Sequence, residues 1–381
     1  MASYINLLPG DVAPDFVQRS LKNPKFVFNS SAGRYLVLCF FCGASNPHSK
    51  AALQAVHRRE DLFDDKFASF YGITIDPYDD DPNGLKEYYP GYRFFLDFDL
   101  SVSRRYGVVD KDATELPPSR EVRRLWIVID PTMRIMKLIT FNRDQSDIPE
   151  LLAYLDSLPP PARYSGLELQ APIIVLPNVF EKEFCEELIS LYEADGGTET
   201  GFMQDVDGKT VAKIDRSHKS RRDFVVKDQD LISKLQGRFY RRVVPEISKI
   251  HQFHVTRMER YIVSCYSEED GGHFRPHRDN TTKGTAHRRF AVSVNLNSDF
   301  DGGEVSFPEY GSRSFKAPPG GAVIFSCSLL HAVSKVTRGR RYAFLPFLYD
   351  DAAAEIRERN NKYLGEDVGT YKDPATVTSP G

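Results

Sequence analysis

The sequence contains no apolar run long enough for a membrane-spanning helix, which needs about 20 residues. Its N-terminal stretch, MASYINLLPGDVAPDF, has acidic residues and prolines where a secretory signal has a basic end and a long apolar core. The formal net charge of the 381 residues is only −3, so no strong overall field attracts nucleic acid or an anionic membrane. These absences predict a cytoplasmic protein that binds neither nucleic acid nor membrane.

Cysteine is scarce, and its placement excludes two common architectures. The five cysteines are odd in number, and no two of them form a C-x-x-C motif. A disulfide framework and a cysteine-based zinc site are therefore not expected. We predict reduced thiols that mostly pack as small apolar side chains, Cys265 and Cys327 among them.

The pattern of apolar residues predicts two domains. Over residues 1–158, strand-like runs such as RYLVLCFF alternate with amphipathic helices, which indicates an α/β layer. A proline-rich linker covers residues 159–172. Residues 173–349 contain two helical stretches and then short strands separated by Gly, Asp, Asn and Pro, a pattern typical of a sandwich or jelly roll. Residues 350–381 are predicted to form a charged helix and a disordered tail.

Two helices of the first domain have start signals. Asn46, followed by Pro47, is a predicted N-cap because its side chain can accept from the free backbone N–H groups of the first turn. Asp147 is the predicted N-cap of the helix DIPELLAYLDSL for the same reason.

An imidazole and a carboxylate stand two positions apart in the second domain, at His277 and Asp279. In a strand such residues point to the same face and can present a nitrogen and an oxygen to one ion. Alone the pair is a weak signal, because about one His-x-Asp is expected by chance in this composition. His331 offers a third donor, and two histidines with one carboxylate suit non-haem Fe(II), although zinc accepts the same donors.

Arg341 follows on a predicted strand, where Ala343 shares its face. An arginine directed into a core is costly unless it meets a carboxylate, ideally in a bidentate pair. No acidic residue stands nearby in the sequence, so a bound dicarboxylate is the expected partner.

Together with the segments GGE (Gly302–Glu304), PGGAVIF (Pro319–Phe325) and VTRGRRY (Val336–Tyr342), these residues resemble the Fe(II)/2-oxoglutarate dioxygenases, in their prolyl 4-hydroxylase-like branch. The resemblance extends from about Ile173 to Tyr349 and implies a double-stranded β-helix. The residues that it implies for the site are the iron ligands His277, Asp279 and His331, then Arg341 for the distal carboxylate of 2-oxoglutarate, and Tyr266 as a hydrogen-bond partner of this cosubstrate.

The implied reaction consumes O2 and 2-oxoglutarate, releases succinate and CO2, and hydroxylates a C–H bond. Asp279 favours hydroxylation, since related halogenases lack this carboxylate, and L-ascorbate is a candidate reductant. The substrate stays open between peptidyl proline, another protein side chain, a free amino acid and a small metabolite, because fold does not fix substrate.

Other features of the second domain have two interpretations. The basic run RSHKSRRDFVV (Arg216–Val226), with Arg288 and Arg289, is either a solvated loop or an entrance loop that contacts an acidic or extended peptide substrate. His273 shares the predicted face of His277 and is a candidate pocket residue.

The segments LLPGDVAPDF, LVLCFFCGASNPHSKAAL, FLDFDLSVSRRYGVVD and RRLWIVIDPTMRI resemble the peroxiredoxin branch of the thioredoxin-like fold, from about Leu7 to Leu158. Arg124 falls at that family's active-site arginine, but Ser49 stands at its peroxidatic cysteine and Asn46 at its threonine. A serine cannot supply the thiolate that reduces peroxide. We therefore expect a noncatalytic domain that docks on the dioxygenase domain or on a partner.

Two alternatives to an oxygenase remain. Cys42, seven positions before Ser49, would be the thiol of a peroxidase. A scaffold in which both domains are inactive is the other alternative, although an inactive site has no physical reason to keep a complete ligand set and a carboxylate clamp.

Overall fold

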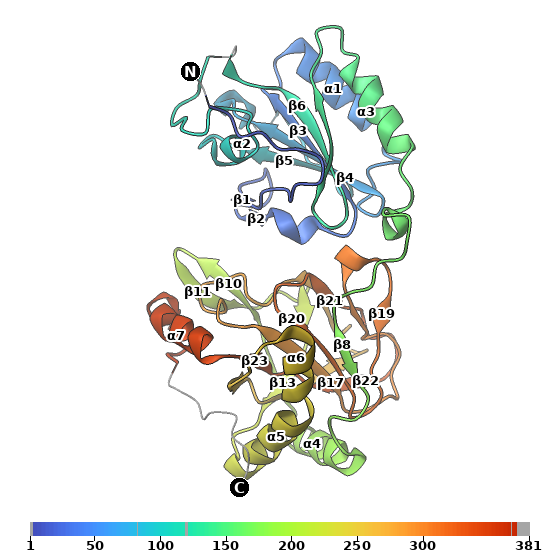
Figure 1. Ribbon diagram of the computed structural model, residues 1–381, viewed down its shortest axis with the longest axis vertical. Coiled ribbons are helices and arrows are strands. Elements are labelled where there is room, and N and C mark those ends of the chain that lie inside the picture. The colour runs from blue at the N-terminus through green and yellow to red at the C-terminus, as the bar shows by residue number, and fades with distance from the viewer. Residues whose placement is uncertain (1–2, 82, 119–120, 367, 372–381) are drawn as a thin grey trace. The chain divides into compact units, whose positions relative to one another are not determined.

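The computed structural model describes residues 3–81, 83–118, 121–366 and 368–371. The chain divides into two compact units (Figure 1). The N-terminal unit runs to Gln170 and also includes Pro308–Ser312, and the C-terminal unit contains the remaining residues from Ala171 onward. In the described ranges, no helix is long and apolar enough to cross a membrane.

A five-stranded mixed sheet forms the centre of the N-terminal unit, in the order β5-β4-β3-β6-β7. Its three parallel strands are β3 (Tyr35–Cys42), β4 (Ala68–Thr74) and β5 (Tyr92–Leu96). Its two antiparallel strands are β6 (Leu125–Ile129) and β7 (Ile135–Thr140). The helices α1 (Pro47–His57) and α3 (Asp147–Asp156) cover one face, where Ala52, Val56, Leu151 and Leu155 pack on buried strand residues. The predicted thioredoxin-like fold is confirmed.

The two predicted N-caps of this unit had different outcomes. Asn46 is the N-cap of α1, and its side-chain oxygen accepts from the backbone N–H groups of His48 and Ser49 at 2.9 and 3.4 Å. The prediction for α3 was wrong, because its N-cap is Ser146. The Asp147 carboxylate is instead buried in the helix, where it accepts from Trp126 Nε1 at 2.9 Å and from the backbone N–H of Asn142 at 3.0 Å.

Two sheets form the jelly roll of the C-terminal unit. The larger sheet has the order β14-β23-β17-β22-β15-β13-β9, with β20 on β17 and β8 on β20. Its strands are β8 (Ile174–Leu176), β9 (Thr198–Glu199), β13 (Arg222–Val225), β14 (Arg257–Glu259), β15 (Ile262–Ser267), β17 (Phe290–Asn295), β20 (Ala322–Ser326), β22 (Arg340–Phe344) and β23 (Phe347–Tyr349). The smaller sheet contains β12 (Lys219–Ser220), β16 (His273–His277), β21 (His331–Val333), β18 (Val305–Ser306) and β19 (Ser314–Phe315), in that order. The predicted double-stranded β-helix is confirmed.

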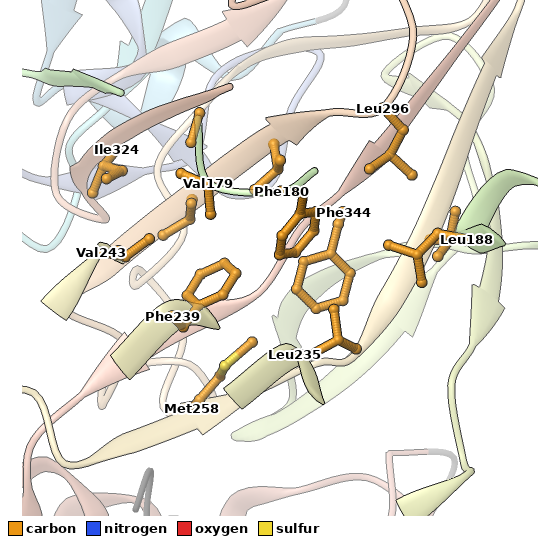
Figure 2. Packing of buried hydrophobic residues seen from close by; sticks show 14 of the residues in the cluster. Val179, Phe180, Leu188, Leu235, Phe239, Val243, Met258, Leu296, Ile324 and Phe344 are labelled. Atoms are coloured by element: carbon orange, nitrogen blue, oxygen red, sulfur yellow. The ribbon is translucent and has the colours of Figure 1, made fainter. Parts of the chain in front are cut away.

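Helices α4 (Lys182–Asp195), α5 (Gln229–Arg242) and α6 (Val244–His251) pack on one face of the larger sheet. Figure 2 shows this core, in which Phe180, Phe239 and Phe344 meet between helix and strand residues. Residues 229–250 form two helices, since Pro245 lies in the first turn of α6, where its missing N–H is tolerated.

The opposite face of the larger sheet meets the smaller sheet through a small interior cluster. Tyr266 from β15 packs with Val333 from β21 and with Val336, and Phe274 from β16 lies against them. Residues of both sheets therefore line one interior, in which the candidate site lies.

The basic run forms strands, and the solvated-loop interpretation is wrong for its central residues. Lys219 is 4% exposed and Arg221 is 7% exposed, because β12 pairs with β16 and β13 pairs with β15. Arg288 is also buried. A further hairpin, β10 (Phe202–Val206) with β11 (Lys209–Lys213), precedes the run and was not predicted.

The end of the chain is more ordered than predicted. Helix α7 (Asp351–Arg359) and a short 3-10 helix (Asn360–Tyr363) follow β23. Leu364 then bridges to Thr210 of β11, and the backbone N–H of Tyr371 donates to Asn361 at 2.8 Å. The rest of the predicted tail, residues 372–381, lies outside the described residues.

Candidate active site

The two histidines of the predicted triad lie opposite each other on paired strands. His277 ends β16, and its Cα partner across the antiparallel pair is His331, the first residue of β21. Asp279 follows two residues after the end of β16, where its backbone N–H donates to the Cys327 carbonyl at 3.0 Å. Asp279 is therefore positioned by this turn and not by strand alternation, which corrects the geometry expected from the sequence.

The three side chains converge on one point. The Nε2 atoms of His277 and His331 lie 3.6 and 3.3 Å from the two carboxylate oxygens of Asp279. One donor atom from each residue falls within 4.8 Å of the other two. The three side chains are 14%, 12% and 6% exposed for His277, Asp279 and His331, so the point is screened but reachable.

Backbone carbonyl groups fix the tautomer of both histidines. Nδ1 of His277 lies 2.8 Å from the Arg275 carbonyl, and Nδ1 of His331 lies 3.0 Å from the Leu329 carbonyl. A carbonyl can only accept, so each Nδ1 carries the proton. Both Nε2 lone pairs are thereby left free for a metal.

Electrostatics favour the same protonation states. Burial lowers the pKa of His331 to about 4, and the neighbouring His277 adds to this effect, so His331 is neutral at physiological pH. Burial acts to raise the pKa of Asp279, but His331 and His277 outweigh it and hold this pKa below the ordinary range. The site therefore offers two imidazole nitrogens and one carboxylate, a donor set that fits Fe(II).

Arg341 is 1% exposed on β22, where Tyr266 of β15 is its Cα partner. Its Nε donates to Asn295 Oδ1 at 3.0 Å and its Nη2 donates to Ser293 Oγ at 2.7 Å. Its Nη1 is buried and has no hydrogen-bond partner among the described residues. Burial lowers the pKa of Arg341 to about 10, so the group stays charged at neutral pH.

Arg341 is therefore a buried cation held by two neutral side chains, with one donor nitrogen left over. Such a group is costly unless an anion compensates it. A ligand carboxylate would accept from the orphan Nη1, as the sequence predicted. Tyr266 is 1% exposed and lies beside this guanidinium, with its ring centroid 5.3 Å from the Arg341 guanidinium carbon.

Sequence reasoning missed a second guanidinium in this pocket. Arg221 donates to the Tyr266 hydroxyl at 3.2 Å and pairs with Asp223, with 2.7 Å between Nε and Oδ1. The available signal was the spacing Arg221-x-Asp223, which in a strand places opposite charges on one face. Because β13 was not predicted, that signal was not used.

His273, the candidate pocket residue, does not join the triad. Its Nδ1 lies 2.8 Å from the Gly271 carbonyl, and its Nε2 lies 3.3 Å from the Ser217 carbonyl. His218 approaches the triad instead, with its ring centroid 6.5 Å from that of His277 and 4.5 Å from that of Phe202.

Ser49 stands at the start of α1, at the position where a peroxiredoxin has its reactive cysteine. Ser49 is fully buried at the start of α1, and its hydroxyl donates to the Phe41 carbonyl at 3.0 Å. Arg124 Nη1 donates to the side chain of the N-cap Asn46 at 3.0 Å. The arginine therefore contacts an amide where a peroxidase would have a thiolate nearby.

Cys42 does not replace the missing thiol. Burial raises the pKa of its thiol to about 12, and Arg124 lowers it only in part. A reactive cysteine needs a lowered pKa, so the Cys42 thiol remains protonated at physiological pH. Cys265 and Cys327 are free, buried thiols, as predicted.

Comparison with known families defines the class of each unit. Residues 261–349 match the model of the 2OG-Fe(II) oxygenase superfamily, and residues 9–138 match the model of the AhpC/TSA family. The chain thus contains an AhpC/TSA domain followed by a 2OG-Fe(II) oxygenase domain. The oxygenase family implies Fe(II) and 2-oxoglutarate.

The curated proteins that are similar to the oxygenase domain include PKHD-type hydroxylases. It is similar to the PKHD-type hydroxylase PiuC of Pseudomonas aeruginosa, at 36% identity over 91 residues, which are 22% of this chain and 39% of that protein. A PKHD-type hydroxylase of Cupriavidus metallidurans is 29% identical over 150 residues, 36% of this chain and 64% of that protein. The chain thus spans less than two thirds of the length of these relatives.

Solved structures with some similarity exist for each unit. A prolyl-4-hydroxylase of Pseudomonas putida is 12% identical, with 47% of this chain and 93% of that chain covered and a TM-score of 0.36. Peroxidoxin BcpB of Mycobacterium tuberculosis is 20% identical, with 40% and 99% covered and a TM-score of 0.35.

Proposed function

We propose that this protein is an Fe(II)- and 2-oxoglutarate-dependent dioxygenase that hydroxylates its substrate and releases succinate and CO2. One observation carries the proposal: a metal-type triad and an uncompensated buried guanidinium line the same interior. His277, Asp279 and His331 present converging donors, and Arg341 keeps one buried nitrogen without a partner among the described residues. Neither feature has a structural purpose in the protein alone.

Each side chain has a separate role in this proposal. The triad would hold the metal on one side, and bound Fe(II) supplies the oxidative chemistry by which O2 converts 2-oxoglutarate and hydroxylates a C–H bond. Arg341 would bind the distal carboxylate of 2-oxoglutarate through Nη1. Tyr266 accepts from Arg221, so its own proton is available for the cosubstrate.

We infer that the N-terminal unit is noncatalytic and serves as a docking domain, either for the oxygenase domain or for a partner. Ser49 in place of the reactive cysteine, and the raised pKa of Cys42, support this proposal over a thiol peroxidase. The complete triad with its orienting carbonyl groups favours an enzyme over a scaffold.

We propose two candidate substrate classes. Peptidyl proline or a similar protein side chain fits a relative of PKHD-type hydroxylases, and a small molecule is the alternative. We also propose O2 as co-substrate, L-ascorbate as a candidate reductant and the cytoplasm as the location. An untargeted mass-spectrometric search for products heavier by one oxygen, in cells with wild-type protein and with Asp279→Ala, would identify the substrate.

The activity itself is tested by succinate release from 2-oxoglutarate. Iron-loaded wild-type protein should form succinate with cell extract as the substrate source, and chelation of the iron should stop it. His277→Ala and Asp279→Ala should each abolish the reaction. His273→Ala is the matched control, because it removes an imidazole from the same strand but outside the triad, and it should retain activity. Wild-type protein that binds iron yet forms no succinate would contradict the proposal.

A further inference from the structure

A second pocket lies in the C-terminal unit and contains none of the triad residues. It has a volume of about 130 Å³. Its walls come from the β10–β11 hairpin, from β14, from the loop before β17, from α7, and from Leu364 and residues 368–371. α7 and the hairpin lie side by side in Figure 1, and the bridge between Thr210 and Leu364 joins the hairpin to the segment after α7.

The pocket is lined by one carboxylate and two guanidinium groups. Glu259, which is 6% exposed, lies 2.8 Å from Arg288 Nε and 2.6 Å from Arg357 Nη2. The two arginines, with His287, hold the pKa of Glu259 well below its ordinary value against the opposing effect of burial, so it stays ionised. Burial lowers the pKa of His287, which is therefore neutral. The charged side chains that line the pocket sum to +1.

Both arginines have donors to spare. Each guanidinium carries five N–H groups. Apart from Glu259, Arg357 donates to the Tyr349 hydroxyl at 2.7 Å, and Arg288 donates to the Asp279 carbonyl at 3.5 Å. In the described part of the chain, neither has a second carboxylate. A small oxyanion would take up the spare donors and balance the excess charge.

The arginines need a hydrogen-bond acceptor, whereas His287 needs a hydrogen-bond donor. It is 2% exposed and lines the pocket, and its Nε2 lies 3.1 Å from a carboxylate oxygen of Glu259. Neither ring nitrogen of His287 has a hydrogen-bond partner among the described residues, because the contact between Nε2 and Glu259 lacks hydrogen-bond geometry. The negative charge of Glu259 beside Nε2 still favours the single ring proton on that nitrogen, which leaves Nδ1 as a bare, buried acceptor. Such an acceptor is satisfied only by a donor from a ligand or a water molecule.

We propose that this pocket is a binding site for a small oxyanion that carries a proton, of the class of hydrogenphosphate or bicarbonate. Its charged oxygens would accept from Arg288 and Arg357, and its O–H would donate to His287 Nδ1. Sulfate has no proton to donate at neutral pH and leaves Nδ1 unsatisfied. A volume of about 130 Å³ admits one such ion, given that a water molecule occupies about 30 Å³ in the liquid. This proposal does not rest on the proposed oxygenase function, although Arg288 also contacts the carbonyl of Asp279.

Isothermal titration calorimetry of the full-length protein tests the site without any substitution. Sodium phosphate, bicarbonate and sulfate are titrated at pH 7.5 and equal ionic strength. We expect phosphate or bicarbonate to bind at least tenfold more tightly than sulfate. Equal affinity for the three ions would overturn the role of His287, and no binding at 20 mM would overturn the site.

Two variants locate the binding. Arg357→Met should weaken binding of the preferred ion at least tenfold, whereas Arg359→Met, an exposed arginine of the same helix, should leave it unchanged. His287→Leu removes both ring nitrogens, and Glu259 keeps its two arginine partners, so this variant should abolish the preference over sulfate. If Arg357→Met does not fold, His287→Leu decides, and an unaltered preference in that variant would refute the proposal.

Discussion

Arg221 and Asp223 form a buried ion pair beside Tyr266, in the interior of the C-terminal unit. The side chains are 5% and 1% exposed, and Ser264 and Thr200 each donate a hydroxyl to Asp223 at 2.6 Å. The carboxylate is thus fully engaged by its neighbours. Arg221 in turn donates to the Tyr266 hydroxyl, so the pair positions Tyr266 beside Arg341.

Removing the acid from this pair should destabilise the C-terminal unit strongly. Asp223→Asn leaves the Arg221 charge buried without compensation, and breaking a buried pair in this way costs about 3–5 kcal/mol in the free energy of unfolding. Urea unfolding followed by circular dichroism measures the change. Asp230→Asn, an exposed acid on α5, is the control and should change stability by less than about 0.5 kcal/mol. Equal effects of the two variants would contradict the role given to the pair.

The same pair predicts the acid limb of the stability profile. Arg221, with Lys219 and Arg260, holds the pKa of Asp223 below its ordinary value although burial opposes this. A carboxyl group with a depressed folded-state pKa stabilises the fold above its unfolded pKa, about 3.9, and this contribution is lost as the pH falls below that value. Stability should therefore drop steeply below about pH 4. In thermal unfolding between pH 7 and 2, Asp223→Asn should show a flatter profile than the wild type.

The sequence predicted those features that depend on neighbouring residues and missed those that depend on contacts between residues remote in sequence. His277, Asp279, His331 and Arg341 were found because their types and spacings are unusual and punctuated by Gly and Pro. The capping role of Asp147 was misjudged because its partners, Trp126 and His48, are remote in sequence. Pairing across strands decided the burial of Lys219 and Arg221, and a chain of such short strands has too little periodicity to reveal it.

Arg341 should control the affinity for 2-oxoglutarate and not that for iron. Arg341→Met removes a charged hydrogen-bond donor worth about 1.5–3 kcal/mol, so the KM for 2-oxoglutarate should rise about 10- to 100-fold. The affinity for Fe(II) should remain within about threefold, because the triad lies on the other sheet. Succinate assays and iron titration measure the two quantities. Arg340→Met, the exposed neighbour on the same strand, is the matched control, and an equal rise in KM there would count against a specific role.

The Cys42 thiol should be unreactive at neutral pH. Burial raises the pKa of this thiol to about 12, so almost none of it is ionised at pH 7, and only the thiolate attacks electrophiles. Alkylation by iodoacetamide, followed by peptide mass spectrometry, should be far slower at Cys42 than at a free cysteine in a peptide. Peroxide consumption should be the same for the wild type and Cys42→Ser. Rapid alkylation, or peroxide turnover lost in that variant, would revive the peroxidase alternative.

The contact between Arg357 and Glu259 bears on how this protein can be shortened for experiments. The stretch that matches the oxygenase family ends at residue 349, whereas Arg357 comes from the helix beyond it. A fragment cut at the family boundary would leave Glu259 without one of its two arginine partners and would open the pocket to solvent. Expression trials should therefore retain the chain at least through Tyr371.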